Sequence, residues 1–120
     1  MNLTIQVIRR GDIFRVTLDP VKGSEQGKTR PCVVIQNNIG NDRSPVTIIA
    51  CITSAKGGEK NYPFTVPIRA SKATGLDVDS IVLLNQIRTV DKGRLIRKIG
   101  QIPKTKMQEV DQALMISLAL

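Results

Sequence analysis

The densest cluster of potentially reactive side chains lies in one short segment. Residues 23–31 are Gly23-Ser24-Glu25-Gln26-Gly27-Lys28-Thr29-Arg30-Pro31. Arg30 comes just before an apolar run, and Pro31 restricts the backbone of Arg30 to an extended conformation. The guanidinium would then project from a rigid base, which suits a group that holds an anion in a fixed geometry. By position alone, an ordinary surface arginine in an ion pair is an equal alternative.

A second group with possible chemistry follows another apolar run. Thr53 and Ser54 end the run that begins at Thr47, so their hydroxyls come where a strand would leave the core. Hydroxyl residues in such places are often turn residues, because they hydrogen-bond to the nearby backbone. Both a catalytic and a turn role are therefore open for this pair.

The chain has no histidine among its 120 residues. This excludes Ser-His and Cys-His nucleophilic pairs, paired-histidine nucleases and histidine-ligated metal sites. Cys32 and Cys51 each lie inside an apolar run at a spacing that matches no metal motif, so we expect buried, inert thiols. The sequence predicts no metal or cofactor, and acid–base chemistry must come from Arg, Lys, Asp, Glu, Tyr or hydroxyl groups.

The formal net charge is +8, which attracts polyanions at low salt. Nucleic acid is the first candidate partner, while an acidic protein or no specific partner are the alternatives. Phe14, Tyr62 and Phe64 are the complete aromatic set, which argues against reading RNA by stacking bases on several exposed rings.

Short β-branched segments separated by turn residues predict most of the secondary structure. We expect strands at residues 13–18, 32–36, 47–52, 79–84, 86–90 and 96–102, and an edge strand at residues 62–68, where prolines limit pairing. Such strands favour a strongly curved antiparallel barrel over a doubly wound fold, which needs a helix at each crossover. Runs 32–36 and 47–52, joined by residues 38–45, lack alternation. Both faces of these strands should therefore be covered, one by the core and the other by a helix or a second subunit.

The C-terminal segment has a different period. Met107, Val110, Leu114 and Leu118 recur every three or four residues and predict an amphipathic helix that packs on the barrel. Thr105 and Gln108 fit a capping box, although Pro103 at a first-turn position would start the helix slightly earlier. We expect a mainly β fold with this one C-terminal helix.

Length and hydropathy predict one domain, residues 1–120. The N-terminus lacks the pattern of a signal peptide, and no stretch approaches the 18 or more apolar residues of a membrane span. We expect a soluble protein in the cytoplasm with no membrane partner.

Several motifs in consistent order together resemble one known family. The matching segments are Arg9-Arg10-Gly11-Asp12-Ile13-Phe14, residues 23–37, Ser44-Pro45, Ile52-Thr53, Asp79-Ser80-Ile81-Val82-Leu83-Leu84, Gln86-Ile87-Arg88-Thr89 and Glu109-Val110-Asp111-Gln112-Ala113-Leu114. These resemble the MazF/PemK toxins of type II toxin–antitoxin systems, over nearly the whole chain.

The resemblance implies a PemK-like, SH3-related barrel and a homodimer. It also implies a metal-independent endoribonuclease that cleaves single-stranded RNA, with mRNA the expected substrate, at short specific sequences. A cognate antitoxin with an acidic segment would silence it. Rival interpretations are a non-enzymatic toxin of the same barrel superfamily that poisons DNA gyrase, and an RNA-binding barrel without chemistry.

The resemblance also assigns roles to residues. Arg30 and Thr53 match the catalytic arginine and threonine, and the match for RNA binding comprises Ser24, Glu25, Gln26, Ser54 and Gln86. Arg15 replaces a common aromatic residue and Asn85 a common acidic one. We expect Asn85 to help select the base beside the cut, because an amide both donates and accepts hydrogen bonds whereas a carboxylate only accepts.

The implied reaction needs neither histidine nor metal. The ribose 2′-hydroxyl attacks the adjacent phosphorus and expels the 5′-oxygen, which leaves a 2′,3′-cyclic phosphate. The protein then has only to align the RNA and stabilise the developing charge, for which a guanidinium fork and a hydroxyl donor are suited. Arg30 and Glu25 are the two candidates for moving protons, and the choice between them is open.

Overall fold

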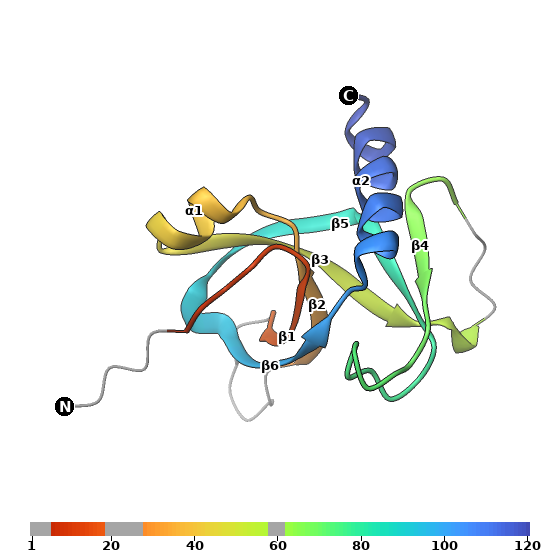
Figure 1. Cartoon of the computed structure of the whole chain (residues 1–120), viewed down its shortest axis with the longest axis horizontal. Helices are drawn as coiled ribbons and strands as arrows, with labels where there is room; N and C mark the ends of the chain where they lie inside the picture. Colours follow the sequence, from red (N-terminus) through yellow and green to blue (C-terminus); the bar gives the residue numbers. More distant parts are fainter. Residues whose placement is uncertain (1–5, 19–27, 58–61) are drawn as a thin grey trace.

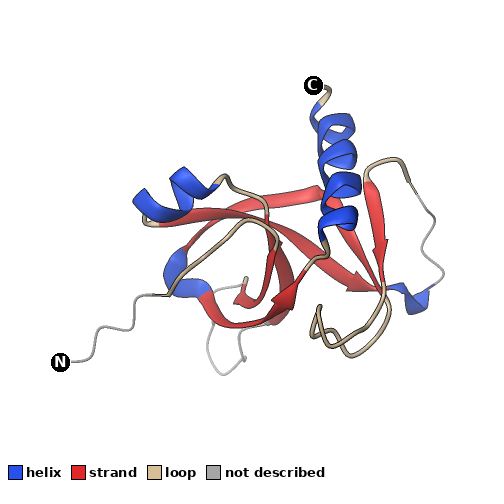
Figure 2. Ribbon diagram, in the orientation of Figure 1, coloured by secondary structure: helices blue, strands red, loops and turns tan. Residues whose placement is uncertain are grey.

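The computed structural model describes residues 6–18, 28–57 and 62–120, and its main element is a six-stranded antiparallel sheet (Figures 1 and 2). Its strands are β1 (Asp12–Thr17), β2 (Thr29–Val34), β3 (Val46–Ser54), β4 (Thr65–Ile68), β5 (Ser80–Asp91) and β6 (Leu95–Gln101). The spatial order is β4-β5-β3-β2-β1-β6. The sheet curls into a barrel-like shape but is not closed, since β4 and β6 form its two edges. The expected curved antiparallel fold is confirmed.

Helical segments lie in three of the connections and at the C-terminus. These are α1 (Asn38–Arg43), the short 3-10 turns η1 (Ala55–Gly57) and η2 (Lys92–Arg94), and the C-terminal α2 (Lys104–Leu118). The segment 38–45, expected only as a connection, contains α1 because the side chain of Asn37 accepts the Gly40 N–H at 2.8 Å and caps it. In the described ranges, no helix combines the length and the apolar character needed to cross a lipid bilayer.

Strands β2 and β3 send alternate side chains into two separate cores, because successive residues of a strand point to opposite faces. Val33, Ala50 and Ile52 pack with Val110 and Ala113 of α2. The opposite face of the same two strands contributes a second set, Cys32, Val34, Ile49 and Cys51, which packs inside the curl of the sheet with Phe14, Val16, Val90 and Leu95. Both faces are covered as expected, and the cover comes from this chain, so a second subunit is not needed for it.

Strand β5 contains an irregularity that the sequence did not predict. Ala50 and Cys51 are adjacent on β3, yet their partners on β5 are Ile87 and Leu83. The intervening residues 84–86 therefore have no partner on β3 and form a bulge. The two segments expected at 79–84 and 86–90 are thus one strand that bends at this bulge.

Helix α2 packs against β4 and β5 (Figure 1), and near its C-terminus the Ser117 hydroxyl donates to the Leu84 carbonyl oxygen of β5 at 2.7 Å. The predicted apolar stripe holds for Val110, which is fully buried, but Leu118 is 48% exposed. The capping-box prediction is wrong: Pro103 is the N-cap residue, and the cap has no side-chain hydrogen bond. Thr105 lies already inside the first turn, so its hydroxyl is not where a capping hydroxyl must be.

Candidate functional site

Arg30 and Thr53 meet where β2 and β3 leave the core. In the β2–β3 register, Cys32 pairs with Cys51. This is the last pair of the β2–β3 ladder, and Arg30 and Thr53 lie two residues beyond it on their own strands, which puts them on the same face as the cysteines. Both residues line the same two surface hollows, so the structure brings together the pair that the sequence singled out.

The backbone of Arg30 is held by its other neighbour. Arg30 pairs with Val16 of β1, and Pro31 next to it is half-buried. The side chain itself is exposed, and within the described ranges its guanidinium has neither a hydrogen bond nor an ion-pair partner. The expected rigid base is present, and the ion-pair alternative has no support among the described residues.

Three hollows of about 340, 290 and 550 Å³ adjoin Arg30, and we call them together the Arg30 groove. Its polar lining residues come from β1 to β5 and the connections next to them: Arg15, Lys28, Arg30, Thr53, Ser54, Tyr62, Thr65, Asp77, Ser80, Asn85, Gln86 and Arg88. The groove is therefore assembled from segments that are distant in sequence.

The charges of this groove favour a polyanion. Arg15, Lys28, Arg30 and Arg88 contribute four positive charges, whereas Asp77 is the one acidic side chain among its described lining residues. Arg15 donates a hydrogen bond of 3.2 Å to the Thr29 hydroxyl, which holds its guanidinium on the β1–β2 side of the groove. Several cations in one hollow are typical of a site that tracks a phosphate backbone.

The bulge in β5 places two neighbouring amides in the groove. Asn85 and Gln86 are both exposed and both line the hollow that contains Arg30 and Thr53. In a regular strand their side chains would point to opposite faces. The bulge removes this restriction, so both amides are available to a ligand beside Arg30.

Tyr62 and Phe64 form an aromatic wall in the same hollow. Their rings stack in parallel, with centroids 5.1 Å apart and planes 3° apart, and Tyr62 is 50% exposed. Three aromatic residues in the whole chain argued only against stacking bases on several exposed rings, and one exposed ring is compatible with that. Tyr62 and Phe64 are two residues apart in the predicted edge strand, and residues at this spacing lie on the same face of a strand. This spacing was the signal that the two rings share a face.

The remaining predicted binding residues have different outcomes. Ser54 lines the groove beside Thr53, and its Oγ accepts the Lys56 N–H at 3.1 Å, so Ser54 also has the turn role considered above. Ser24, Glu25 and Gln26 lie outside the described residues. Within the described ranges, no three His, Cys, Asp or Glu side chains come together as a metal site would require.

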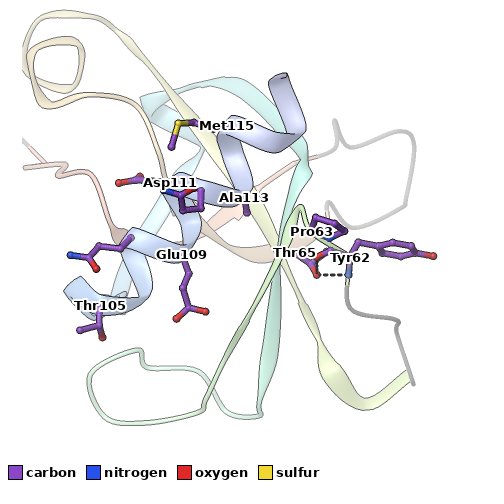
Figure 3. Close-up of a pocket in the computed structure, with 10 residues that line it drawn as sticks. Tyr62, Pro63, Thr65, Thr105, Glu109, Asp111, Ala113 and Met115 are labelled. Atoms are coloured by element: carbon purple, nitrogen blue, oxygen red, sulfur yellow. Dashed lines mark hydrogen bonds between the residues drawn. The ribbon is translucent and has the colours of Figure 1, made fainter. Parts of the chain in front are cut away.

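A larger cavity, of about 830 Å³, lies elsewhere, between α2 and the chain that leads into β4 (Figure 3). Glu109 and Asp111 line it, and none of its lining residues is basic. Figure 3 shows the Tyr62 ring pointing away from the helix. Both carboxylates are ion-paired, Asp111 with Arg10 at 2.7 Å and Glu109 with Lys106 at 3.2 Å, and no lining residue offers a positive charge to a phosphate backbone, so volume alone does not identify the nucleic-acid site.

Comparison with known proteins gives two close matches in sequence. A family model described as "PemK-like, MazF-like toxin of type II toxin-antitoxin system" matches residues 9–118. The protein named Endoribonuclease EndoA from Bacillus subtilis (strain 168) is 50% identical over 114 residues, which cover 95% of this chain and 97% of that protein.

Solved structures agree with the fold. The MazE-MazF complex (Form-II) from Deinococcus radiodurans matches with a TM-score of 0.77 at 27% identity, over 97% of this chain and 99% of the other. An endoribonuclease from Mycobacterial species also has a TM-score of 0.77, at 19% identity over 98% and 97% of the two chains. At that identity the second match shows the shared fold alone.

Proposed function

The chain belongs to the PemK-like, MazF-like toxin family of type II toxin–antitoxin systems, and from this premise we propose that Arg30 and Thr53 are its catalytic residues for RNA cleavage. The protein acts as an endoribonuclease, the activity in the name of its 50% identical relative, and the proposal adds that it is sequence-specific and cuts single-stranded RNA. One observation carries the assignment: an exposed arginine and a threonine lie side by side in a groove with four positive charges.

The chemistry follows from what these two side chains can do. The 2′-hydroxyl of the substrate is the nucleophile, so the protein supplies alignment and charge stabilisation. The Arg30 guanidinium donates hydrogen bonds to the phosphoryl oxygens as negative charge accumulates, and the Thr53 hydroxyl donates to the same group. An arginine keeps its proton at neutral pH, so Arg30 acts through its charge and its donors. Glu25 is then the candidate that accepts the 2′-hydroxyl proton.

Other residues of the groove hold the RNA in register. Asn85, Gln86 and Ser54 offer hydrogen-bonding groups to base edges and riboses, and the proposal includes Ser24 and Gln26 in this role. Tyr62 adds an exposed ring on which one base can stack, a contact worth roughly 1–3 kcal/mol per base. The substrate is mRNA in the cytoplasm, and the whole chain, residues 1–120, works as one domain.

The cognate antitoxin is the second partner. A related solved structure is a MazE-MazF complex, and the basic Arg30 groove suits an acidic segment that folds as it binds. We propose that this segment and RNA compete for the groove. A segment that bound together with an uncleavable RNA would contradict this.

A homodimer is part of the same proposal. Since this chain itself covers both faces of β2 and β3, those strands give no support for a dimer, and the support comes from the end of α2. The last two turns of α2 expose Met115, Ile116 and Leu118 at 39%, 54% and 48%, and Leu120 just beyond the helix is 86% exposed. Such an apolar helix end favours burial against a second copy. Sedimentation at micromolar concentration should give a dimer, and an active monomer would contradict it.

Replacing Arg30 tests the proposed active site. We expect Arg30→Ala to lower the cleavage rate by about 10²–10³-fold, the usual effect of losing one donor to a developing charge. Its matched control is Arg43→Ala, an exposed arginine at the end of α1 and outside the groove. Both variants should keep the wild-type melting temperature. Equal activity of the two variants would refute the assignment, and RNA binding without cleavage by the unaltered protein would favour a binding module.

A further inference from the structure

Cys32 and Cys51 lie directly opposite each other on neighbouring strands. The Ile35 N–H donates to the Ile48 carbonyl oxygen at 2.9 Å, so this pair of residues is hydrogen-bonded across β2 and β3. Hydrogen-bonded and non-hydrogen-bonded pairs alternate along an antiparallel ladder. Three steps along the register, Cys32 and Cys51 are therefore a non-hydrogen-bonded pair, the kind in which the facing side chains approach most closely.

The two thiols differ in their access to solvent. Cys32 is fully buried and its Sγ lies 3.7 Å from the Arg30 carbonyl oxygen. Cys51 is 7% exposed and lines the 290 Å³ hollow of the Arg30 groove together with Lys28, Arg30 and Arg88. A small reagent in the groove can therefore reach Cys51, and Cys51 in turn faces Cys32.

The surroundings favour a thiolate at Cys51. The pKa of Cys51 falls from 9.0 to about 7, because a hydrogen bond from the Cys32 thiol and the charges of Arg30 and Arg88 together lower it by more than burial raises it. The same hydrogen bond and burial raise the pKa of Cys32. A thiolate whose pKa is near the ambient pH combines availability with nucleophilicity, so Cys51 is suited to react first.

We propose that Cys51 is an oxidation site for hydroperoxides, and that Cys32 resolves the product into a disulfide within the chain. In the first step the Cys51 thiolate attacks one oxygen of hydrogen peroxide, the O–O bond breaks, and Cys51 sulfenic acid and hydroxide form. In the second step the Cys32 sulfur attacks the sulfenic sulfur, the S–O bond breaks, and the Cys32 proton leaves with the oxygen as water.

This inference changes the expectation from the sequence. Burial alone predicted inert thiols, and the burial is confirmed. A register that pairs the two cysteines across β2 and β3, and a hollow that reaches one of them, cannot be derived from their spacing in the sequence.

A disulfide here would disturb the proposed catalytic pair, a consequence that depends on the proposed function. Arg30 and Thr53 are two residues from the cysteines on the same strands and the same face. Opposite Cβ atoms are about 4.5–5.5 Å apart in a ladder but about 3.8 Å apart in a disulfide, so the strands must approach by roughly 1 Å. A displacement of about 1 Å can cost about a hundredfold in rate.

A competing effect has the opposite sign. Oxidation removes the negative charge of the thiolate beside Arg30, which would strengthen phosphate binding. Charge effects at a solvent-exposed arginine amount to a few-fold at most, less than the geometric loss. We therefore expect the disulfide to lower the cleavage rate, by about tenfold to a hundredfold.

The thiol chemistry is tested without reference to RNA. The reduced full-length protein is treated with hydrogen peroxide, its remaining thiols are alkylated, and the intact mass is measured. We expect both thiols to disappear together with a mass loss of two hydrogen atoms, and dithiothreitol to restore both thiols. In untreated protein, the alkylation rate of Cys51 should titrate near pH 7. Two free thiols after treatment, disulfides only between chains, or alkylation that titrates near pH 9 would overturn the proposal.

Two variants separate the steps. Cys32→Ala should leave a Cys51 sulfenic acid, detected by a dimedone adduct, with no disulfide. Cys51→Ala should leave Cys32 unoxidised, because the buried thiol has no reactive partner. Oxidation of Cys32 in the second variant would contradict the order of attack.

Cleavage gives a separate result. Oxidised wild-type protein should cut more slowly and recover with dithiothreitol, whereas Cys51→Ala should respond to neither reagent. A disulfide that forms without changing cleavage would overturn the coupling to the Arg30 groove. If no preparation cleaves RNA, the proposed function fails, while the mass measurement still decides the thiol chemistry.

Discussion

At the scale of single residues, the site depends on Arg30 and Thr53 having different surroundings. Arg30 is exposed and its long side chain can adjust to a phosphate, whereas Thr53 is half-buried and its short side chain is carried on the backbone of β3. A flexible charge and a fixed donor together can follow a phosphoryl group as its geometry changes. The residue types and the extended backbone at Arg30 could be predicted from the sequence. That both residues line the same groove could not, because it depends on how β2 and β3 pair in the folded sheet.

The Thr53 hydroxyl can be tested apart from the Thr53 shape. Thr53→Ser keeps the hydroxyl and should retain most of the cleavage rate, while Thr53→Val keeps the branched shape and Thr53→Ala keeps neither. We expect the Thr53→Val and Thr53→Ala variants each to lose about a hundredfold in cleavage rate, as for the removal of one donor to an oxyanion. Initial rates on a labelled single-stranded RNA, with thermal melts of each variant, would measure this. A Val variant as fast as wild type would leave Thr53 a structural role only.

Asn85 should govern which sites are cut. Asn85→Glu replaces a donor and acceptor by an acceptor alone, beside the proposed catalytic pair. When a base loses a needed hydrogen bond to the site, its binding in the transition state weakens by about 1–3 kcal/mol, which lowers the cleavage rate by about one to two decades. We expect sequencing of 5′-ends from a mixed RNA pool to show a changed order of preferred sites with total activity nearly unchanged.

The control for Asn85 is Thr89→Glu. Thr89 is exposed on the same strand but does not line the Arg30 groove. The Thr89→Glu substitution adds the same negative charge as Asn85→Glu. It should leave the order of sites as in the wild type. If Asn85→Glu and Thr89→Glu behave alike, Asn85 does not select bases.

At the scale of elements, most strands could be predicted because burial and turn residues are local signals. The strand expected at residues 13–18 is β1, and the edge strand expected at residues 62–68 is β4, which begins only at Thr65. The bulge at residues 84–86 arises from pairing with β3, and no local pattern encodes that partner. The consequence for function is direct, since the bulge is what turns both Asn85 and Gln86 toward the groove.

Helix α2 gives a stability test of the same kind. Val110 is fully buried against the sheet, so Val110→Ala removes two buried carbon atoms and should cost about 2 kcal/mol of unfolding free energy. Thr105→Ala should change it by less than about 0.5 kcal/mol, because Thr105 caps nothing, whereas a working cap would cost about 1 kcal/mol. Urea unfolding of both variants decides this, and a loss at Thr105 as large as at Val110 would restore the capping box.

At the scale of the whole molecule, the sequence predicted the sign of the charge but not its distribution. The net charge of +8 describes the whole chain and gives no location on the surface. The structure separates a basic Arg30 groove from the cavity lined by Glu109 and Asp111. This separation depends on the curl of the sheet, which brings β1 to β5 around one groove. RNA and an acidic antitoxin segment should both prefer the basic face, and their binding should weaken as salt rises.

The central claim is that this molecule cuts RNA by making the substrate's own 2′-hydroxyl the nucleophile, without a metal ion. The most direct measurement is the chemical identity of the ends produced from single-stranded RNA in excess EDTA. We predict undiminished cleavage with 2′,3′-cyclic phosphate and 5′-hydroxyl ends, because the chain has no histidine and Arg30 supplies the positive charge at the phosphate. Activity abolished by EDTA, or products with 5′-phosphate ends, would contradict the account.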